Sequence, residues 1–214
     1  MGRWSLPVIL MLLAARPLRA QDGSPRLDLS TPAVITAHVD APTVSMREVL
    51  AEGHRRELLN AGWPTVLHCR VELWKRGLFF YDLESSVAWD LIVEFVPATK
   101  VYRVQRQQDG KLQSLGQFTT IDEAEQVIDR PWRVPNSPTS KGARYYYVFS
   151  LDLQTLSGSD LDAWQRWVRG DAEPAIRGKA SPVTALRRGL GSLLSRVLGG
   201  ETQHYEKRAA FTAH

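Results

Sequence analysis

The chain has a single cysteine, Cys69, among its 214 residues. This excludes an intramolecular disulfide, so stability has to come from a hydrophobic core, and the chain is long enough to form one. Cys69 alternates with Leu67, Val71 and Leu73, which predicts a small buried apolar side chain at this position. A catalytic thiol would need a neighbouring histidine or another cause of a lowered pKa, and the sequence indicates neither.

The sequence also lacks the motifs of the common catalytic and cofactor sites. It has no G-x-S-x-G elbow, no Walker A loop, no C-x-x-C pair and no H-E-x-x-H helix. The histidines lie on different predicted elements without the spacing of metal ligands; they are His38, His54, His68, His204 and His214. We therefore predict no cofactor, no metal and no catalytic residue. A divergent hydrolase with dispersed residues is the last-ranked alternative.

Beyond the first twenty residues the chain lacks an excess of either charge. Those residues contain Arg3, Arg16 and Arg19, so the 27 basic residues fall to 24, against 23 acidic ones. Binding of nucleic acid needs a concentrated basic surface. A nearly neutral chain therefore predicts that nucleic acid is not a partner.

The N-terminal segment has the parts of a secretory signal peptide. Arg3 precedes the apolar run Leu6–Ala15, which at ten residues is too short to cross a bilayer. The small residue Ala20 predicts cleavage before Gln21. We expect a signal peptide at 1–20 and an exported protein, periplasmic or extracellular, with an uncleaved membrane anchor as the alternative.

The remaining chain is rich in short alternating runs, which predict one β-rich domain over 33–214 after a mobile lead-in at 21–32. In the clearest run, every second residue from Val87 to Phe95 is large and apolar, as in a strand with one buried face. Similar runs predict strands at 33–40, 65–75, 100–106, 111–118, 143–153 and 203–212. The predicted fold class is mainly β, an antiparallel sandwich or half-open barrel of about seven or eight strands with two to four peripheral helices.

Turn and cap residues predict how these elements begin and end. Asp109-Gly110 predicts a type I′ hairpin. Ser45 and Glu48 have the spacing of a capping box, which predicts a helix from Ser45 that ends at Gly62, with two short helices divided at Gly53 as the alternative. The apolar run Leu78–Tyr81 is either an edge strand or a loop folded over the core.

A second capping box, at Thr120 and Glu123, predicts another helix. Asp122, Glu123 and Glu125 crowd its first turn, where they oppose the positive end of the helix dipole. A metal site is the alternative interpretation of this acidic cluster. The helix dipole accounts for the cluster without a metal, and no histidine joins it.

The C-terminal third combines a linker at 170–181 with a basic amphipathic helix at 182–198, inserted before the last strand. A leucine stripe beside arginines suits an anionic membrane surface or the groove of a protein partner. The alternative is a helix folded onto its own sheet. The predicted contact residues are Leu186, Arg187, Arg188, Leu190, Leu193, Leu194, Arg196 and Val197.

The order of elements carries a family resemblance. Gly62-Trp63-Pro64 leads into the strand Val66–Trp74, and a ribbon with Tyr102-Arg103-Val104 leads into Phe118–Ala124. This order resembles domain-of-unknown-function family 4390, a group of small exported bacterial proteins, over roughly residues 30 to 155. The resemblance implies export and a compact domain. It implies no activity, ligand or site residue, and the C-terminal third departs from the family's usual length.

Together these observations predict a non-enzymatic envelope protein that binds a protein partner or an anionic membrane surface. A second hypothesis is a carrier of an apolar small ligand. Its basis is the aromatic side chains along 87–95 and 145–153, which could line an interior for such a ligand.

Overall fold

The computed structural model describes residues 24–155 and 203–214 of the chain. The predicted signal peptide at 1–20, linker at 170–181 and helix at 182–198 lie outside the described residues. The described part holds two helices and nine strands, which are, in chain order, β1 (Arg26–Ser30), β2 (Thr43–Arg47), α1 (Gly53–Asn60), β3 (Thr65–Arg76), β4 (Tyr81–Val96), β5 (Val101–Gln108), β6 (Lys111–Phe118), α2 (Ile121–Ile128), β7 (Trp132–Arg133), β8 (Arg144–Thr155) and β9 (Gln203–Thr212).

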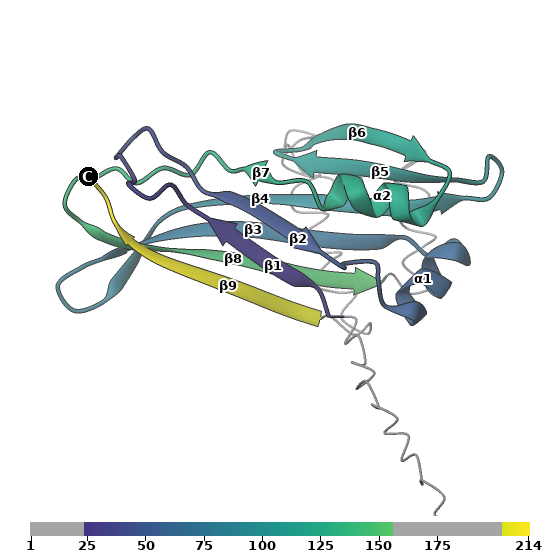
Figure 1. Cartoon of the computed structure of the whole chain (residues 1–214), viewed down its shortest axis with the longest axis horizontal. Helices are drawn as coiled ribbons and strands as arrows, with labels where there is room; N and C mark the ends of the chain where they lie inside the picture. The colour runs from purple at the N-terminus through teal and green to yellow at the C-terminus, as the bar shows by residue number, and fades with distance from the viewer. Residues whose placement is uncertain (1–23, 156–202) are drawn as a thin grey trace, which may run out of the picture.

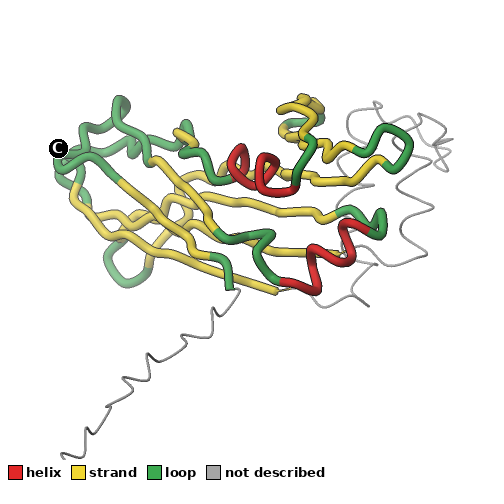
Figure 2. Tube along the Cα trace, turned by 45° about the vertical axis from the view of Figure 1, so that its right-hand side comes forward, coloured by secondary structure: helices red, strands yellow, loops and turns green. Residues whose placement is uncertain are grey.

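The strands form two antiparallel sheets that stack as a sandwich (Figure 1). One sheet has the strand order β6-β5-β4-β3-β8-β9, and the other has the order β1-β2-β7. The smaller sheet lies over one face of the larger sheet, and α2 continues the same layer (Figures 1 and 2). The predicted mainly β fold is confirmed in its sandwich form. The described part has nine strands, where the sequence predicted seven or eight.

β3 is the central strand of the larger sheet because it pairs with β4 on one side and β8 on the other. Its inward side chains Leu67, Cys69, Val71 and Leu73 are fully buried, as their alternation predicted. The inward residues of β8, every second one from Tyr145 to Leu153, are buried as well. Since full burial of one such side chain contributes about 1.5–3 kcal/mol, these two strands supply much of the core.

β4 follows its predicted alternation in its central part. Trp89, Leu91 and Val93 are buried on the core side, and the ring of Trp89 stacks on Phe149 with centroids 6.4 Å apart. Ile92 points to the opposite face and is also buried, with 1 % of its surface exposed. The prediction of a single dry face is therefore wrong at Ile92, whose side chain is buried although it points away from the core side.

The segment 21–32, predicted to be a mobile lead-in, contains β1, so the prediction is wrong for Arg26–Ser30. β1 pairs with all five residues of β2 in the smaller sheet. Leu27 and Leu29 belong to the core cluster or pack against it. Two alternating leucines in a polar segment are too short a pattern to predict a strand, and the pairing partner lies further along the chain.

The strand predicted over 33–40 is wrong because a side chain closes a turn within it. The Asp40 carboxylate accepts a hydrogen bond from Thr36 N at 2.8 Å, and Asp40 N donates to Thr36 O at 3.0 Å. His38 has a φ of 63°, which interrupts an extended chain. Extended pairing of this segment with the described residues consists of one bridge at Ile35.

The helix predicted from Ser45 to Gly62 begins only at Gly53, so its first half is wrong. Thr43–Arg47 is instead strand β2, held between β1 and β7. A capping box at Ser45 needs a helical Glu48, but Glu48 has a φ of 59°. The predicted end is confirmed, because Gly62 has a φ of 91° and its N–H bonds to a carbonyl of the last turn.

The β5–β6 hairpin has the turn that its sequence predicted. Asp109 and Gly110 have φ values of 50° and 74°, as a type I′ turn requires. Further along β6, a register shift leaves Leu115 without a cross-strand partner and forms a bulge. Gly116 follows with a φ of 144°. A Cβ at this position would lie only 2.5 Å from the ring of Phe118, so the bulge requires glycine here.

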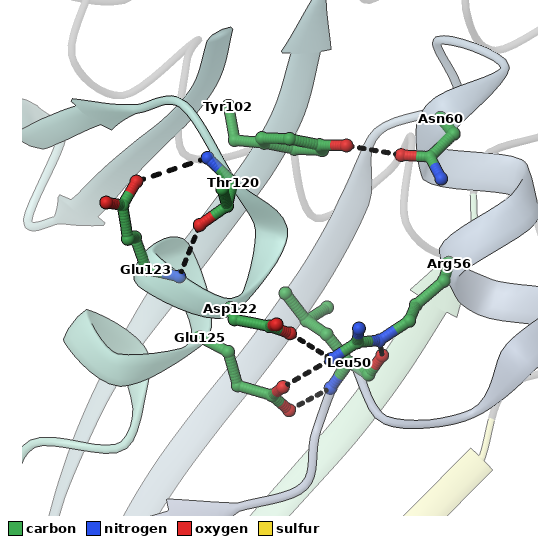
Figure 3. A network of polar contacts seen from close by, with 8 residues as sticks. All are labelled: Leu50, Arg56, Asn60, Tyr102, Thr120, Asp122, Glu123 and Glu125. Atoms are coloured by element: carbon green, nitrogen blue, oxygen red, sulfur yellow. Dashed lines mark hydrogen bonds and ion pairs between the residues drawn. The ribbon is translucent and has the colours of Figure 1, made fainter.

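α2 begins at the predicted capping box. Thr120 Oγ1 accepts a hydrogen bond from Glu123 N at 3.2 Å, and the Glu123 carboxylate accepts one from Thr120 N at 3.1 Å (Figure 3). Ala124, Val127 and Ile128 are buried, as their helical spacing predicted. The start of α2 and its buried face are therefore both specified by residues close together in the sequence.

Arg56 of α1 ties α2 to the segment that follows β2 (Figure 3). Its guanidinium lies 2.7 Å from Asp122 Oδ1 and 3.0 Å from Glu125 Oε2, and it donates to Leu50 O at 2.8 Å. Glu125 Oε1 accepts a further bond from Leu50 N at 2.9 Å. The acidic cluster thus binds an arginine. Residues 24–155 and 203–214 contain no group of three or more His, Cys, Asp or Glu that could hold a metal ion.

Replacing Arg56 by Met should destabilise the protein by about 1–2 kcal/mol, because the largely buried carboxylate of Glu125 loses its cation. The free energy of unfolding in urea measures this effect. Arg130→Met, at an exposed position just after α2, is the control and should change stability by less than about 0.5 kcal/mol. Equal losses in the two variants would contradict a bridging role for Arg56.

Asp129, the C-cap of α2, has a carboxyl group that resists ionisation. Its Oδ1 is buried without a hydrogen-bond partner among the described residues. Burial, and to a smaller extent the neighbouring Glu125, raises the pKa of Asp129 from 3.8 to about 6. Because the folded-state pKa is the higher one, the ionised carboxylate lowers stability. This cost is absent below about pH 4 and grows as the pH rises through 6.

Asp129→Asn should therefore stabilise the protein at pH 8 by about 1 kcal/mol, after allowance for solvent screening of a half-exposed group. Near pH 3 the variant and the natural protein should unfold at the same urea concentration. Asp28→Asn, at an exposed position of β1, tests whether loss of any carboxylate has the same effect. A stabilisation independent of pH would overturn this account.

Candidate functional site

The most exposed large apolar side chains of the described residues lie together at the tip of the β3–β4 hairpin. Leu78, Phe79 and Phe80 expose 97 %, 89 % and 80 % of their surface, and Tyr81 at the start of β4 is also exposed. The prediction that Leu78–Tyr81 is an edge strand or a loop over the core is therefore wrong. The turn is too short to fold back onto the sheet.

The turn itself is tight and fixed by its glycine. Arg76 pairs with Tyr81, and Gly77 N donates to Phe80 O at 2.7 Å, so the loop consists of the four residues 77–80. A Cβ on Gly77 would lie 2.9 Å from the Asp82 carboxylate and 3.0 Å from Phe80 O. The backbone thus closes on itself at Gly77 and turns the three apolar side chains outward.

Aromatic rings form a collar directly below the tip. Trp74 pairs with Tyr146 across β3 and β8, and their rings stack with centroids 6.1 Å apart and planes 3° apart. Tyr81 meets Tyr146 edge to face at 4.8 Å. Leu83 pairs with Trp74 from the β4 side, which places all four side chains on one face of the sheet.

Basic residues outnumber acidic ones around this collar. Residues 74–84 and 138–146 contain four basic side chains and two acidic ones: Lys75, Arg76, Lys141 and Arg144 against Asp82 and Glu84. Three of the basic residues are exposed, namely Arg76, Lys141 and Arg144. The apolar tip therefore emerges from an aromatic and positively charged base.

The base of the hairpin is held by a loop that follows β7. A register shift in the β3–β4 pairing leaves Glu84 without a cross-strand partner. Its carboxylate accepts hydrogen bonds from Thr139 N and Thr139 Oγ1, both at 2.9 Å, and from Tyr145 OH at 3.2 Å. Lys75 Nζ donates to Ser140 Oγ at 2.7 Å. Both strands of the hairpin are thus bound to residues 139–140.

The same loop is anchored in the core by Asn136, which is 2 % exposed. Asn136 Nδ2 donates to Val71 O at 3.1 Å, Asn136 O accepts from Tyr147 OH at 2.6 Å, and the Ser85 hydroxyl bonds to its side-chain oxygen. Burial, with Glu84 nearby, raises the pKa of Tyr147 well above its ordinary value, so its hydroxyl stays a donor. These bonds attach the hairpin base to the core.

The contact residues predicted from the sequence and the exposed apolar tip seen in the structure are different parts of the chain. The predicted contact residues Leu186–Val197 lie outside the described residues. The hairpin tip was missed because an apolar run is first interpreted as buried. One signal could have identified the tip. Only three large apolar residues follow the turn at Gly77, and three residues are too few for a separate buried strand.

Two histidines, which the sequence scatters over different elements, lie in one cross-strand row. Asp90, His68, Asp152 and His204 are successive partners across β4, β3, β8 and β9. His68 Nδ1 lies 2.6 Å from Asp90 Oδ1, and His204 Nδ1 lies 2.5 Å from Asp152 Oδ1. The hydrogen bond to Asp90, opposed by burial and helped by the charges of Asp90 and Asp152, raises the pKa of His68.

The interpretation of Cys69 as a small buried apolar side chain is confirmed, since it has no exposed surface. Burial raises the pKa of its thiol well above the ordinary value, so the thiol is protonated at neutral pH.

Neither described helix is long and apolar enough to cross a membrane.

Comparison with known proteins gives no match of any kind. No family model, no curated protein and no solved structure matches the chain. The resemblance to domain-of-unknown-function family 4390 thus stays a prediction.

The ion pair of His68 predicts a pH-dependent stability. The contribution of its charged form is complete below the ordinary pKa of 6.5 and is lost as the pH rises through the higher folded-state pKa. Between about pH 6 and pH 9, the natural protein should lose on the order of 1 kcal/mol more stability than His68→Asn. Urea unfolding at both pH values measures the difference. His54→Asn, at an exposed position of α1, is the control. Parallel pH curves for all three proteins would refute the prediction.

Proposed function

We propose that the protein is an exported, non-enzymatic envelope protein that binds an anionic membrane surface through the tip of its β3–β4 hairpin. The observation that carries this proposal is the exposure of Leu78, Phe79 and Phe80 above a hydrogen-bonded base. Contiguous exposed apolar side chains on a folded protein mark a contact with something outside it.

The order of side chains along the hairpin matches the layers of a bilayer surface. Leu78, Phe79 and Phe80 come first and suit the boundary of the acyl chains. Trp74, Tyr81 and Tyr146 follow, and tryptophan and tyrosine are the residues enriched at the headgroup level. The basic residues at the same level, Arg76, Lys141 and Arg144, would contact anionic headgroups, each contributing about 1 kcal/mol.

A membrane explains this tip better than a protein partner does. A stable protein interface buries about 800 Å² on each partner, spread over a broad patch. The exposed apolar residues of the hairpin instead project from a narrow turn above the aromatic collar, and the exposed basic residues Arg76, Lys141 and Arg144 surround that collar. A bilayer accepts a narrow projection without a complementary pocket.

The expected affinity is modest. Three fully buried side chains at about 1.5–3 kcal/mol each would contribute on the order of 5 kcal/mol. This is close to the marginal, reversible binding given by a single acyl chain, with an association constant of about 10⁴ M⁻¹. The proposed binding is therefore peripheral and depends on additional contacts.

Other features of the sequence support a location at the envelope. The apolar run at Leu6–Ala15 and the small residue Ala20 are typical of a signal peptide, and family 4390, which the chain resembles, consists of exported bacterial proteins. The predicted helix at 182–198 would supply a basic amphipathic segment in addition to the hairpin tip. These features are consistent with a periplasmic or extracellular protein.

The carrier hypothesis has less support. The aromatic side chains of 87–95 and 145–153 that motivated it pack against other side chains of the protein, as Trp89 does on Phe149 and Tyr147 on Phe211 at 4.9 Å. The hypothesis stays a prediction, and a mass that copurifies with the protein in native mass spectrometry would favour it.

The triple substitution L78S/F79S/F80S should lower the partition coefficient onto anionic phosphatidylglycerol vesicles by at least about tenfold, because most of the apolar transfer free energy is lost. Cosedimentation with vesicles measures the coefficient, using protein purified after export so that every variant has the same N-terminus. The unfolding midpoint should not fall, since the three side chains lie outside the core.

Two controls separate apolar insertion from other effects. F79L/F80L keeps the tip apolar and should retain binding, while Leu112→Ser removes an exposed leucine from β6, away from the tip. Unchanged partitioning of the triple variant would reject the proposal. So would a photocrosslinker at position 79 that captures an envelope protein in cells and no lipid, which would assign the site to a protein partner.

A further inference from the structure

A second exposed apolar loop lies at the same end of the sandwich as the hairpin tip (Figure 1). It joins β1 to β2 and spans residues 31–42. Val34 and Val39 expose 58 % and 62 % of their surface, while Ile35 and Ala37 between them are buried. The buried pair holds the loop against the sandwich and leaves the two valines outside.

Exposed apolar side chains are concentrated at this end of the molecule. The described residues include eight exposed large hydrophobic side chains, and seven of them belong to the two loops or the first residues of β4: Val34, Val39, Leu78, Phe79, Phe80, Tyr81 and Leu83. The eighth, Leu112, lies on the edge strand β6, opposite Gln107 and away from this end. A random scatter of single hydrophobic residues would not favour one end.

One segment supports both loops. His38 N donates to Pro138 O at 2.8 Å, while the adjacent residues Thr139 and Ser140 bind the hairpin through Glu84 and Lys75. The C-terminus adds a second tie, since Ala37 N donates to His214 O at 3.1 Å and His214 N donates to Ile35 O at 2.8 Å. Residues 138–140 therefore link the two loops through hydrogen bonds to each.

We propose that the loop at 31–42 is a second membrane-contact site, in which Val34 and Val39 enter the same bilayer surface as the hairpin tip. This inference rests on the proposed function. Its energetic basis is that the three apolar side chains of the tip alone bind only marginally, so burial of Val34 and Val39 would strengthen the attachment. Its geometric basis is the support that both loops share at residues 138–140.

An environment-sensitive fluorophore tests the placement of each loop. The dye NBD is attached to a cysteine introduced at position 39, 79 or 112 in the exported protein; the natural Cys69 is fully buried and does not compete. With phosphatidylglycerol vesicles, V39C and F79C should show a blue-shifted emission that brominated lipids quench. L112C should remain in water and keep its emission.

The outcomes distinguish the second site from the proposed function. If position 79 enters the bilayer and position 39 stays in water, the second site is refuted while the hairpin contact stands. If no labelled protein binds vesicles, both proposals fail. Unlabelled V34S/V39S supplies an independent measure, and it should lower the partition coefficient by about tenfold with an unchanged unfolding midpoint; unchanged partitioning would also refute the second site.

Discussion

The structure depends above all on the pairing of β3 with both of its neighbours. Because side chains alternate along a strand, a register slip of one residue would turn Leu67, Cys69, Val71 and Leu73 out of the core. The pairing to β4 runs through to the last residue, Arg76, so the turn that follows has to project beyond the sheet. The same constraint that builds the core therefore fixes the position of the apolar tip.

Features that the sequence specifies locally could be predicted from it. The alternation of β3 and β8, the type I′ turn at Asp109-Gly110 and the capping box at Thr120 each depend on residues within a few positions of one another. Their physical causes are a buried face, a positive φ and an unpaired backbone amide, and each cause acts within one element. Such features need no knowledge of the partner strand.

Features that depend on distant partners could not be predicted. Thr43–Arg47 has a helix-like cap pattern, but pairing with β1 and β7 makes it a strand. The Asp40 side chain closes a turn within residues 33–40, whose sequence predicted a strand. The candidate site was missed for another reason: buried residues tend to be apolar, but an apolar residue need not be buried. Only the short loop length at Gly77–Phe80 distinguishes the two cases.

The β5–β6 hairpin of the larger sheet shows that an apolar tip is not needed to join two of its strands. The chain closes β5 and β6 with the polar pair Asp109-Gly110, a turn that fits the twist of the strands and exposes no large side chain. At the end of β3 and β4 it instead places Leu78, Phe79 and Phe80 in water, which favours aggregation and gains nothing for the core. Since backbone atoms of Gly77 and Phe80 make the hydrogen bond that closes the turn, the three apolar side chains are not needed for its closure, which supports the proposed contact with a membrane surface.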